Sequence, residues 1–262
     1  MSRLTNKGFS APFNLFTTIS EVVTTAPFTS LSTVAGERFD SADGREFVVV
    51  CNGAVALAAG KLVQSIPITA NHQNLVVTAY SPASSTVPYT TISVTLGNTA
   101  ATVNQYAGGY LVVNDNNGEG QTLKIQSHPA IDALGTGVFT LEDTAITAIT
   151  TASEVCLIPN PYVGVVINPT TATNTPIGVT ISAIAASTAS PLVAGNTAVY
   201  GLIQTKGPVS ALADGTIGVG LGIMPSTNTA GAVLVADATG ARIGRALQAA
   251  VTTEYRTVYI DL

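Results

Sequence analysis

Short runs of β-branched and aromatic residues alternate with turn signals along most of this chain of 262 residues. Runs such as Phe47–Val50 and Leu75–Thr78 have the composition of strands. In Thr91–Leu96, apolar side chains alternate with hydroxyl side chains, which predicts a strand with one buried face and one exposed face. Turn sequences such as Asn52-Gly53 and Asp214-Gly215 separate the runs.

Helices of any length are hard to find in this pattern, and residues 143–149 and 244–250 are the weak candidates. We therefore predict an all-β protein, built of one or two small β-sandwich or β-barrel domains preceded by an extended N-terminal arm.

Charged side chains are scarce. Asp, Glu, Lys and Arg make up 10% of the residues, against roughly 25% in a typical soluble domain. Between Phe47 and Asn114 the only residue of these four types is Lys61. A surface with so little charge suits burial against neighbouring subunits.

The composition also argues against two kinds of partner. The net charge is -5 and Lys and Arg form no cluster, whereas nucleic-acid binding needs concentrated positive charge. Ser, Thr, Asn, Gly or Pro interrupts every apolar run before it approaches the roughly 20 residues that cross a bilayer. The first residues lack the apolar core and cleavage site of a secretory leader. We therefore expect no nucleic-acid partner, no membrane partner, and folding in a cytoplasm.

The first 46 residues differ from the rest, since they hold nine of the 25 charged residues and five of the seven Phe. Residues 1–46 are therefore predicted to form an arm, followed by a β domain over 47–175 and a C-terminal β-barrel module over 176–262. The boundary between the two domains falls in the Thr-, Ser-, Ala- and Pro-rich stretch 169–198.

Aromatic side chains spaced along an arm need somewhere to dock. Phe9, Phe13, Phe16 and Phe28 are the candidate interface residues. They would either anchor on a neighbouring subunit or fold back onto the core of their own chain, because aromatic residues are ordinary in both places. Five tyrosines in the β regions suit core edges and contacts in the same way: Tyr106, Tyr110, Tyr162, Tyr200 and Tyr255.

Residues able to perform acid–base chemistry are few. The only histidines, His72 and His128, lie near no nucleophile motif such as GxSxG. The acidic pair Glu142-Asp143 would point to opposite faces of a strand, so a loop or helix start explains it better than a glycosidase site. We expect no enzymatic activity and no catalytic residues.

Motifs for metals and cofactors are equally weak. The run Asn114–Gly120 has the composition of a calcium loop but not the EF-hand spacing, and it predicts a hairpin turn instead. The run Gly218–Gly222 lacks the lysine of a phosphate-binding loop, so close strand packing explains it better. Cys51 and Cys156 have no CxxC partner and are expected to be reduced, buried fillers. No cofactor or metal is expected.

Several stretches in the middle of the chain resemble virion structural proteins of tailed bacteriophages. They are Tyr106–Asp115, Gly118–Ile125, His128–Ala130 and Asn160–Val166.

The C-terminal part carries the stronger likeness, in Tyr200–Pro208, Thr229–Ala232 and Ile243–Leu247. It resembles the small β-barrels of phage head-decoration proteins, which commonly end in an Ile-Gly-x-Ala strand, a turn and a last Val-rich strand. The arm and the nearly uncharged segment after it lie outside this likeness.

The resemblance implies a capsid decoration, or cement, subunit. Such a protein binds the outside of the major capsid protein lattice, stabilises the shell, and forms a homo-oligomer, typically a trimer at symmetry axes of the capsid surface of the virion. Two alternatives stay open. One is a head-fibre, tail or adhesin module that recognises a host surface, although no long repeats or coiled stalk are visible. The other is a β-stranded glycan-processing enzyme, although the chain has no Trp to line a sugar groove.

Overall fold

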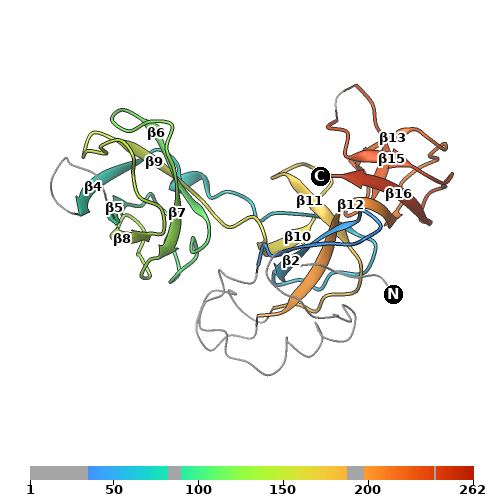
Figure 1. Ribbon diagram of the computed structural model, residues 1–262, viewed down its shortest axis with the longest axis horizontal. Coiled ribbons are helices and arrows are strands. Elements are labelled where there is room, and N and C mark those ends of the chain that lie inside the picture. The colour runs from blue at the N-terminus through green and yellow to red at the C-terminus, as the bar shows by residue number, and fades with distance from the viewer. Residues whose placement is uncertain (1–34, 82–89, 188–197, 239) are drawn as a thin grey trace. The chain divides into compact units, whose positions relative to one another are not determined.

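The computed structural model describes residues 35–81, 90–187, 198–238 and 240–262, which fold almost entirely as strands (Figure 1). Their only helical element is a short 3-10 turn, Ala70–His72. The prediction of an all-β fold is confirmed. Both helix candidates are wrong, because residues 143–149 form bends and β15 (Gly244–Ala246) opens the second segment as a strand.

The described residues divide into two compact units, and the second is inserted into the first. Of the described residues, unit 1 contains 35–66, 161–187, 198–238 and 240–262, and unit 2 contains 67–81 and 90–160.

Unit 2 is a closed β-barrel. Its strands follow the order β4 (Leu75–Ser81), β5 (Thr91–Thr95), β8 (Thr136–Leu141), β7 (Thr122–Ser127), β6 (Tyr110–Asp115) and β9 (Glu154–Ile158). Every pair of neighbours is antiparallel, so short turns suffice to join several of them.

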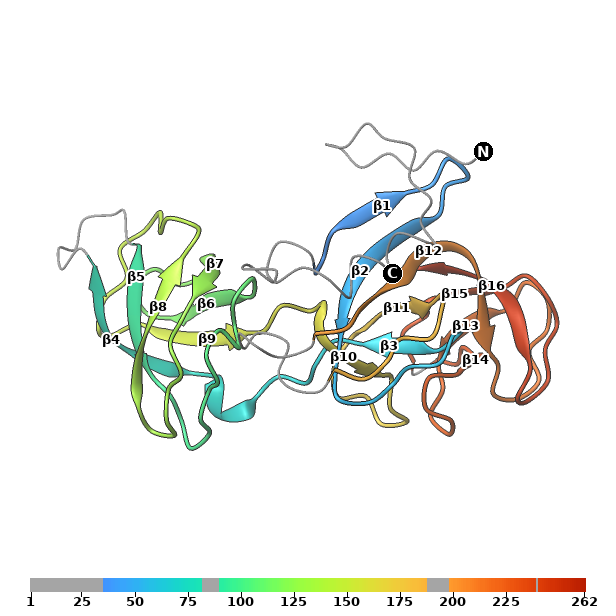
Figure 2. The same cartoon turned by 90° about the horizontal axis from the view of Figure 1, so that it is seen from below.

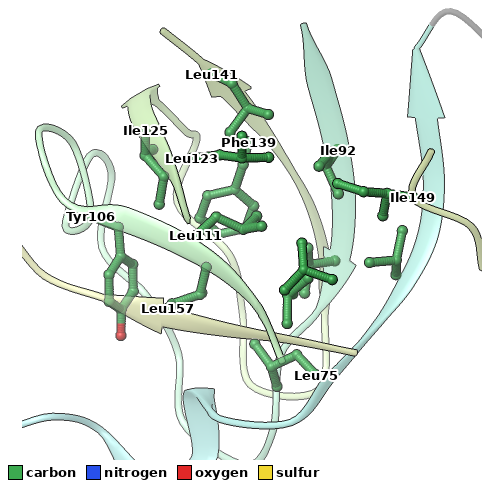
Figure 3. Packing of buried hydrophobic residues seen from close by; sticks show 14 of the residues in the cluster. Leu75, Ile92, Tyr106, Leu111, Leu123, Ile125, Phe139, Leu141, Ile149 and Leu157 are labelled. Atoms are coloured by element: carbon green, nitrogen blue, oxygen red, sulfur yellow. The ribbon is translucent and has the colours of Figure 1, made fainter. Parts of the chain in front are cut away.

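Side chains from all six strands fill the barrel of unit 2 (Figure 3). Ile92 and Val94 on β5 are fully buried, while Thr91, Ser93 and Thr95, which alternate with them, are half-buried, as predicted. The turn between β6 and β7 contains Asn116 and Gly118, both with positive φ, which confirms the predicted hairpin.

Unit 1 contains a first ring of five strands. The ring follows the order β2 (Glu46–Asn52), β10 (Val163–Ile167), β3 (Leu62–Gln64), β11 (Pro176–Thr180) and β12 (Tyr200–Leu212), and β12 pairs back with β2. Strand β1 (Arg38–Asp40) extends the sheet from β2. Val48, Val63 and Ile203 are buried inside this ring together with Val165.

A second ring of unit 1 shares β12 with the first. From β12 the order continues through β16 (Tyr255–Asp261), β15, β13 (Gly222–Pro225) and β14 (Val233–Val235), and a bridge between Ala213 and Val233 returns to the end of β12. Its interior contains Val209, Ala211 and Val258, among other aliphatic residues. Figure 2 shows β12 running from β2 towards the strands of this second ring.

Strand β12 changes partner near Gly207. Tyr200–Gln204 and Lys206 pair with β2, and Lys206–Leu212 pair with β16, so Lys206 has a partner on both sides. Gly207 has a φ of +93°, a conformation that glycine adopts without steric cost, and Pro208 follows it. The bend lets one 13-residue strand serve two rings.

The structure divides the chain elsewhere than at residues 46/47 and 175/176. Residues 35–46 belong to unit 1, because β1 pairs with β2 and Gly36 N donates to Val49 O. The second ring lies within the predicted module 176–262, but β11 and β12 also complete the first ring. Long-range pairing between β2 and β12 unites segments that sequence reasoning had separated.

Candidate interaction surface

The two histidines are parts of the core of unit 2. His72 Nε2 contacts Thr99 O at 2.8 Å, and its Nδ1 contacts the Tyr106 hydroxyl. His128 Nδ1 contacts Pro129 O at 2.7 Å, and its Nε2 accepts from Tyr106 N at 3.0 Å. Since carbonyl oxygens only accept, the nitrogen facing each carbonyl carries the proton; the Nε2 of His128 accepts, so that ring is held in one neutral tautomer.

Aromatic packing encloses this pair. The rings of His128 and Phe139 lie 4.8 Å apart, and Tyr106 is almost fully buried beside both. Burial is the main cause that lowers the pKa of His128 from its ordinary value. The arrangement is that of a hydrogen-bonded core.

The acidic pair is engaged by one lysine residue. Lys124 Nζ lies 2.6 Å from Glu142 Oε2, and the backbone N–H of Lys124 donates to Asp143 Oδ2 at 2.8 Å. Both carboxylates therefore hold the bend after β8 against Lys124 on β7. In the described part of the chain, no group of three or more His, Cys, Asp or Glu side chains is arranged to hold a metal ion.

The two cysteines are free thiols in different environments. Cys51 is fully buried on β2, and burial raises the pKa of its thiol to about 11. Cys156 is only half-buried on β9, where its Sγ lies 3.2 Å from Asn114 Oδ1. Of the two predicted buried fillers, only Cys51 is buried.

The predicted interface residues Phe9, Phe13, Phe16 and Phe28 lie outside the described residues.

Two segments of the second ring expose aliphatic side chains next to each other. Residues 217–221 and 246–251 run side by side, because Ile217 and Ala250 exchange two backbone hydrogen bonds of 3.0 Å. Gly220 N also donates to Ala246 O at 2.8 Å, and Ala246 N donates to Leu221 O at 2.9 Å. We call the four exposed residues of these segments the barrel-end patch: Val219, Leu221, Leu247 and Val251, each between 42% and 67% exposed.

No charge interrupts the segments that carry the barrel-end patch. Residues 215–236 and 246–253 contain no Asp, Glu, Lys or Arg. Exposed apolar residues in the other unit, such as Val76 on β4 and Ile146 in the bends after β8, lie on separate elements. Scattered exposed apolar side chains are normal, but a contiguous group of them marks an interaction site.

Sequence reasoning missed the barrel-end patch although it singled out Gly218–Gly222. The run was expected to pack strands closely, but residues 219 and 220 form a turn, and Gly220 has a φ of +80°. The signal was the alternation of Gly with Val and Leu, because a turn rich in glycine places its apolar side chains outside.

Comparison with family models, with curated proteins and with solved structures gives no match to this chain. Within the described residues no helix is long and apolar enough to cross a bilayer.

Proposed function

We propose that this protein is a non-enzymatic structural subunit of a virus particle, which decorates the outside of the major capsid protein lattice and stabilises the shell. The observation that carries the proposal is the barrel-end patch, an uncharged apolar surface on a chain with few charges of any kind. The resemblance of residues 106–262 to phage virion and head-decoration proteins supplies the identity of the partner.

The size of the barrel-end patch sets the strength of one contact. Burying an exposed Val or Leu side chain contributes about 1.5–3 kcal/mol, and these four are roughly half exposed, so the patch contributes about 3–6 kcal/mol. Association itself costs about 4–15 kcal/mol. One patch is therefore too small for lasting attachment, and several linked copies are needed.

Self-association would link several copies of the barrel-end patch. A homo-oligomer, which the resemblance implies to be a trimer, presents several patches to the lattice at once, so each patch after the first binds at high effective concentration. Sedimentation of the purified protein tests this part of the proposal, which predicts a trimer and is contradicted by a monomer at all concentrations.

The N-terminal segment adds a second contact in this proposal. Phe9, Phe13, Phe16 and Phe28 would insert into the neighbouring shell subunit, since aromatic anchors contribute strongly at interfaces. A variant lacking residues 1–34 keeps β1 and all later strands. We expect it to attach more weakly to shells and to keep the circular dichroism of the full chain. Undiminished attachment would remove the arm from the proposal.

The patch is tested by adding charge to it. Val219→Asp combined with Leu247→Asp places two carboxylates in the contact, and a buried unpaired charge opposes association. Rebinding to shells stripped of this protein should fall at least about tenfold, equivalent to 1.4 kcal/mol. Val55→Asp combined with Ile146→Asp makes the same changes at exposed residues outside the patch and should bind normally. Equal binding by both variants would contradict the role of the patch.

A further inference from the structure

Unit 1 contains a pocket of about 480 Å³ beside the bend of β12. Strands β2, β11, β12 and β16 contribute to its walls. Its volume falls within the range of small-molecule sites, roughly 300–1,000 Å³. The polar residues of the pocket, among them Arg45, Gln204 and Ser210, belong neither to the hydrophobic clusters of unit 1 nor to the barrel-end patch.

Tyr255 forms an aromatic wall of the pocket. Its ring lies against Gly60, where a Cβ would meet Tyr255 Cδ1 and Cε1 at 2.7 Å. Only glycine allows this approach, and Gly60 also has a φ of +70°. Gly60 N donates to Thr180 O and Gly60 O accepts from Leu212 N, so the support behind the ring is fixed. Tyr255 is nevertheless 44% exposed, which leaves ring surface for a ligand.

Gln204 supplies an unused acceptor in the pocket. The residue is 1% exposed, and its Nε2 donates to Lys206 O at 2.8 Å and to Pro208 O at 2.9 Å. Both amide hydrogens are thereby used. No hydrogen bond to its Oε1 is found among the described residues, and this oxygen is not one of their fully enclosed unpaired atoms, so it is open to a ligand or to water in the pocket. A ligand with a donor group could give Gln204 Oε1 a hydrogen bond.

The charge of the pocket is balanced. Among the described residues that line the pocket, only Arg45 is charged, and its Nε donates to Asp43 Oδ2 at 2.8 Å. The guanidinium lies over the ring of Phe47, 5.4 Å from the ring centre. Arg45 keeps other N–H donors, but its net charge is matched, so the site does not select an anion.

Together these groups define the ligand. We propose that this pocket binds a neutral sugar ring, a hexopyranose at the end or along the chain of a glycan. A pyranose presents an apolar C–H face that can lie on Tyr255 and hydroxyl groups that both donate and accept. One hydroxyl donates to Gln204 Oε1, and the others accept from Arg45 and from the exposed hydroxyl of Ser210. A purely apolar ligand would leave Gln204 Oε1 unpaired, and an acyclic polyol lacks the flat face.

This inference does not depend on attachment to a capsid. It gives the protein a second surface, which would bring a decorated particle to glycans on a cell. The pocket and the barrel-end patch share no residue, so each can fail its test without the other.

The test is a titration of the full chain with single sugars, followed by amide-resolved NMR. The probes are the methyl pyranosides of glucose, mannose and galactose and N-acetylglucosamine, with sorbitol as the acyclic control. At least one pyranoside should bind with a millimolar dissociation constant and shift the amide signals of Gln204, Ser210 and Tyr255, while sorbitol shifts none. Absence of shifts with every pyranoside would overturn the proposal. Shifts at these amides with inorganic phosphate or a blocked alanine–proline peptide, but with no sugar, would also overturn it.

Variants assign the binding to the pocket. Tyr255→Ala should weaken the sugar about tenfold, and Tyr255→Phe, which keeps the ring, should bind within about twofold of the native chain. Ala59→Phe fills the pocket from an exposed position and should abolish binding even if Tyr255→Ala disturbs the fold. Tyr110→Ala removes a tyrosine of similar exposure from unit 2 and should leave sugar binding unchanged. Unchanged affinity in both Tyr255→Ala and Ala59→Phe would place the sugar elsewhere and contradict the proposal.

Discussion

Removing a single hydroxyl from unit 2 should destabilise that unit alone. Tyr106→Phe keeps the ring against Phe139 and His128 but deletes the oxygen that contacts His72 Nδ1. His72 is 0% exposed, and its Nε2 proton is committed to Thr99 O at 2.8 Å. The Nδ1 of His72 is then left as a buried polar atom without this hydrogen-bond partner.

The size of the effect follows from this geometry. Leaving one buried polar group unsatisfied costs about 1–3 kcal/mol. For a domain of this size, 1 kcal/mol shifts the unfolding temperature by about 4–8 °C, so the transition of unit 2 should fall by roughly 4–24 °C. Unit 1 has separate hydrophobic clusters in its two rings, and its transition should not move.

Hydrogen exchange read residue by residue separates the two units. Amide protons of Leu111 and Phe139 report on the barrel of unit 2, and those of Ile203 and Val258 report on the two rings of unit 1. In Tyr106→Phe the first pair should exchange faster and the second pair should not change. Equal acceleration of all four would refute the division into separately cored units, and no acceleration would refute the role of the hydroxyl.

Three further predictions concern backbone strain, pH and thiol reactivity. Gly207→Ala combines a φ of +93° with a Cβ 2.9 Å from Arg45 Cγ, so it should destabilise unit 1 by about 1–3 kcal/mol in urea unfolding. Gly215→Ala has a similar φ of +86° but open space, and an equal loss in both variants would show that the contact with Arg45 contributes nothing. Burial lowers the pKa of His128 below 6.5, so the unfolded chain binds more protons than the folded chain in this range. Stability of unit 2 should therefore be complete above about pH 6.5 and fall as the pH drops, whereas flat thermal melting between pH 7.5 and 5 (roughly one unit to either side of the histidine range) would contradict it. Native protein should react with a thiol reagent at Cys156 and not at Cys51, whose pKa is raised to about 11, and peptide mapping that finds Cys51 labelled first would contradict its burial.

Local features of the fold were readable from the sequence. The alternation in Thr91–Leu96 specifies β5, and the Asn- and Gly-rich run after β6 specifies a hairpin, because side-chain period and turn conformation are decided within a few residues. Non-local pairing was not readable. Glu46–Asn52 pairs with Tyr200–Gln204, although all of unit 2 lies between these segments in the sequence. Neither segment carries a local pattern that predicts the other as its partner.

The surfaces were harder to predict than the strands. A glycine-rich run has the same sequence pattern whether it packs strands closely or forms an exposed turn. The pattern of Gly218–Gly222 therefore did not predict the barrel-end patch. The pocket depends on Gly60, Gln204 and Tyr255, which meet through the pairing of β12 with its neighbours and share no local motif. The sequence predicted Tyr255 as a residue suited to contacts. It did not predict that Gly60 and Gln204 lie in the same pocket, because strand pairing brings them there.

The most direct test of the proposed role is the copy number of this polypeptide in purified virus particles, measured by quantitative mass spectrometry against the major capsid protein. Decoration of the lattice predicts a ratio near one-to-one or a simple fraction set by the lattice symmetry. A few copies per particle, or none, would contradict a decoration subunit.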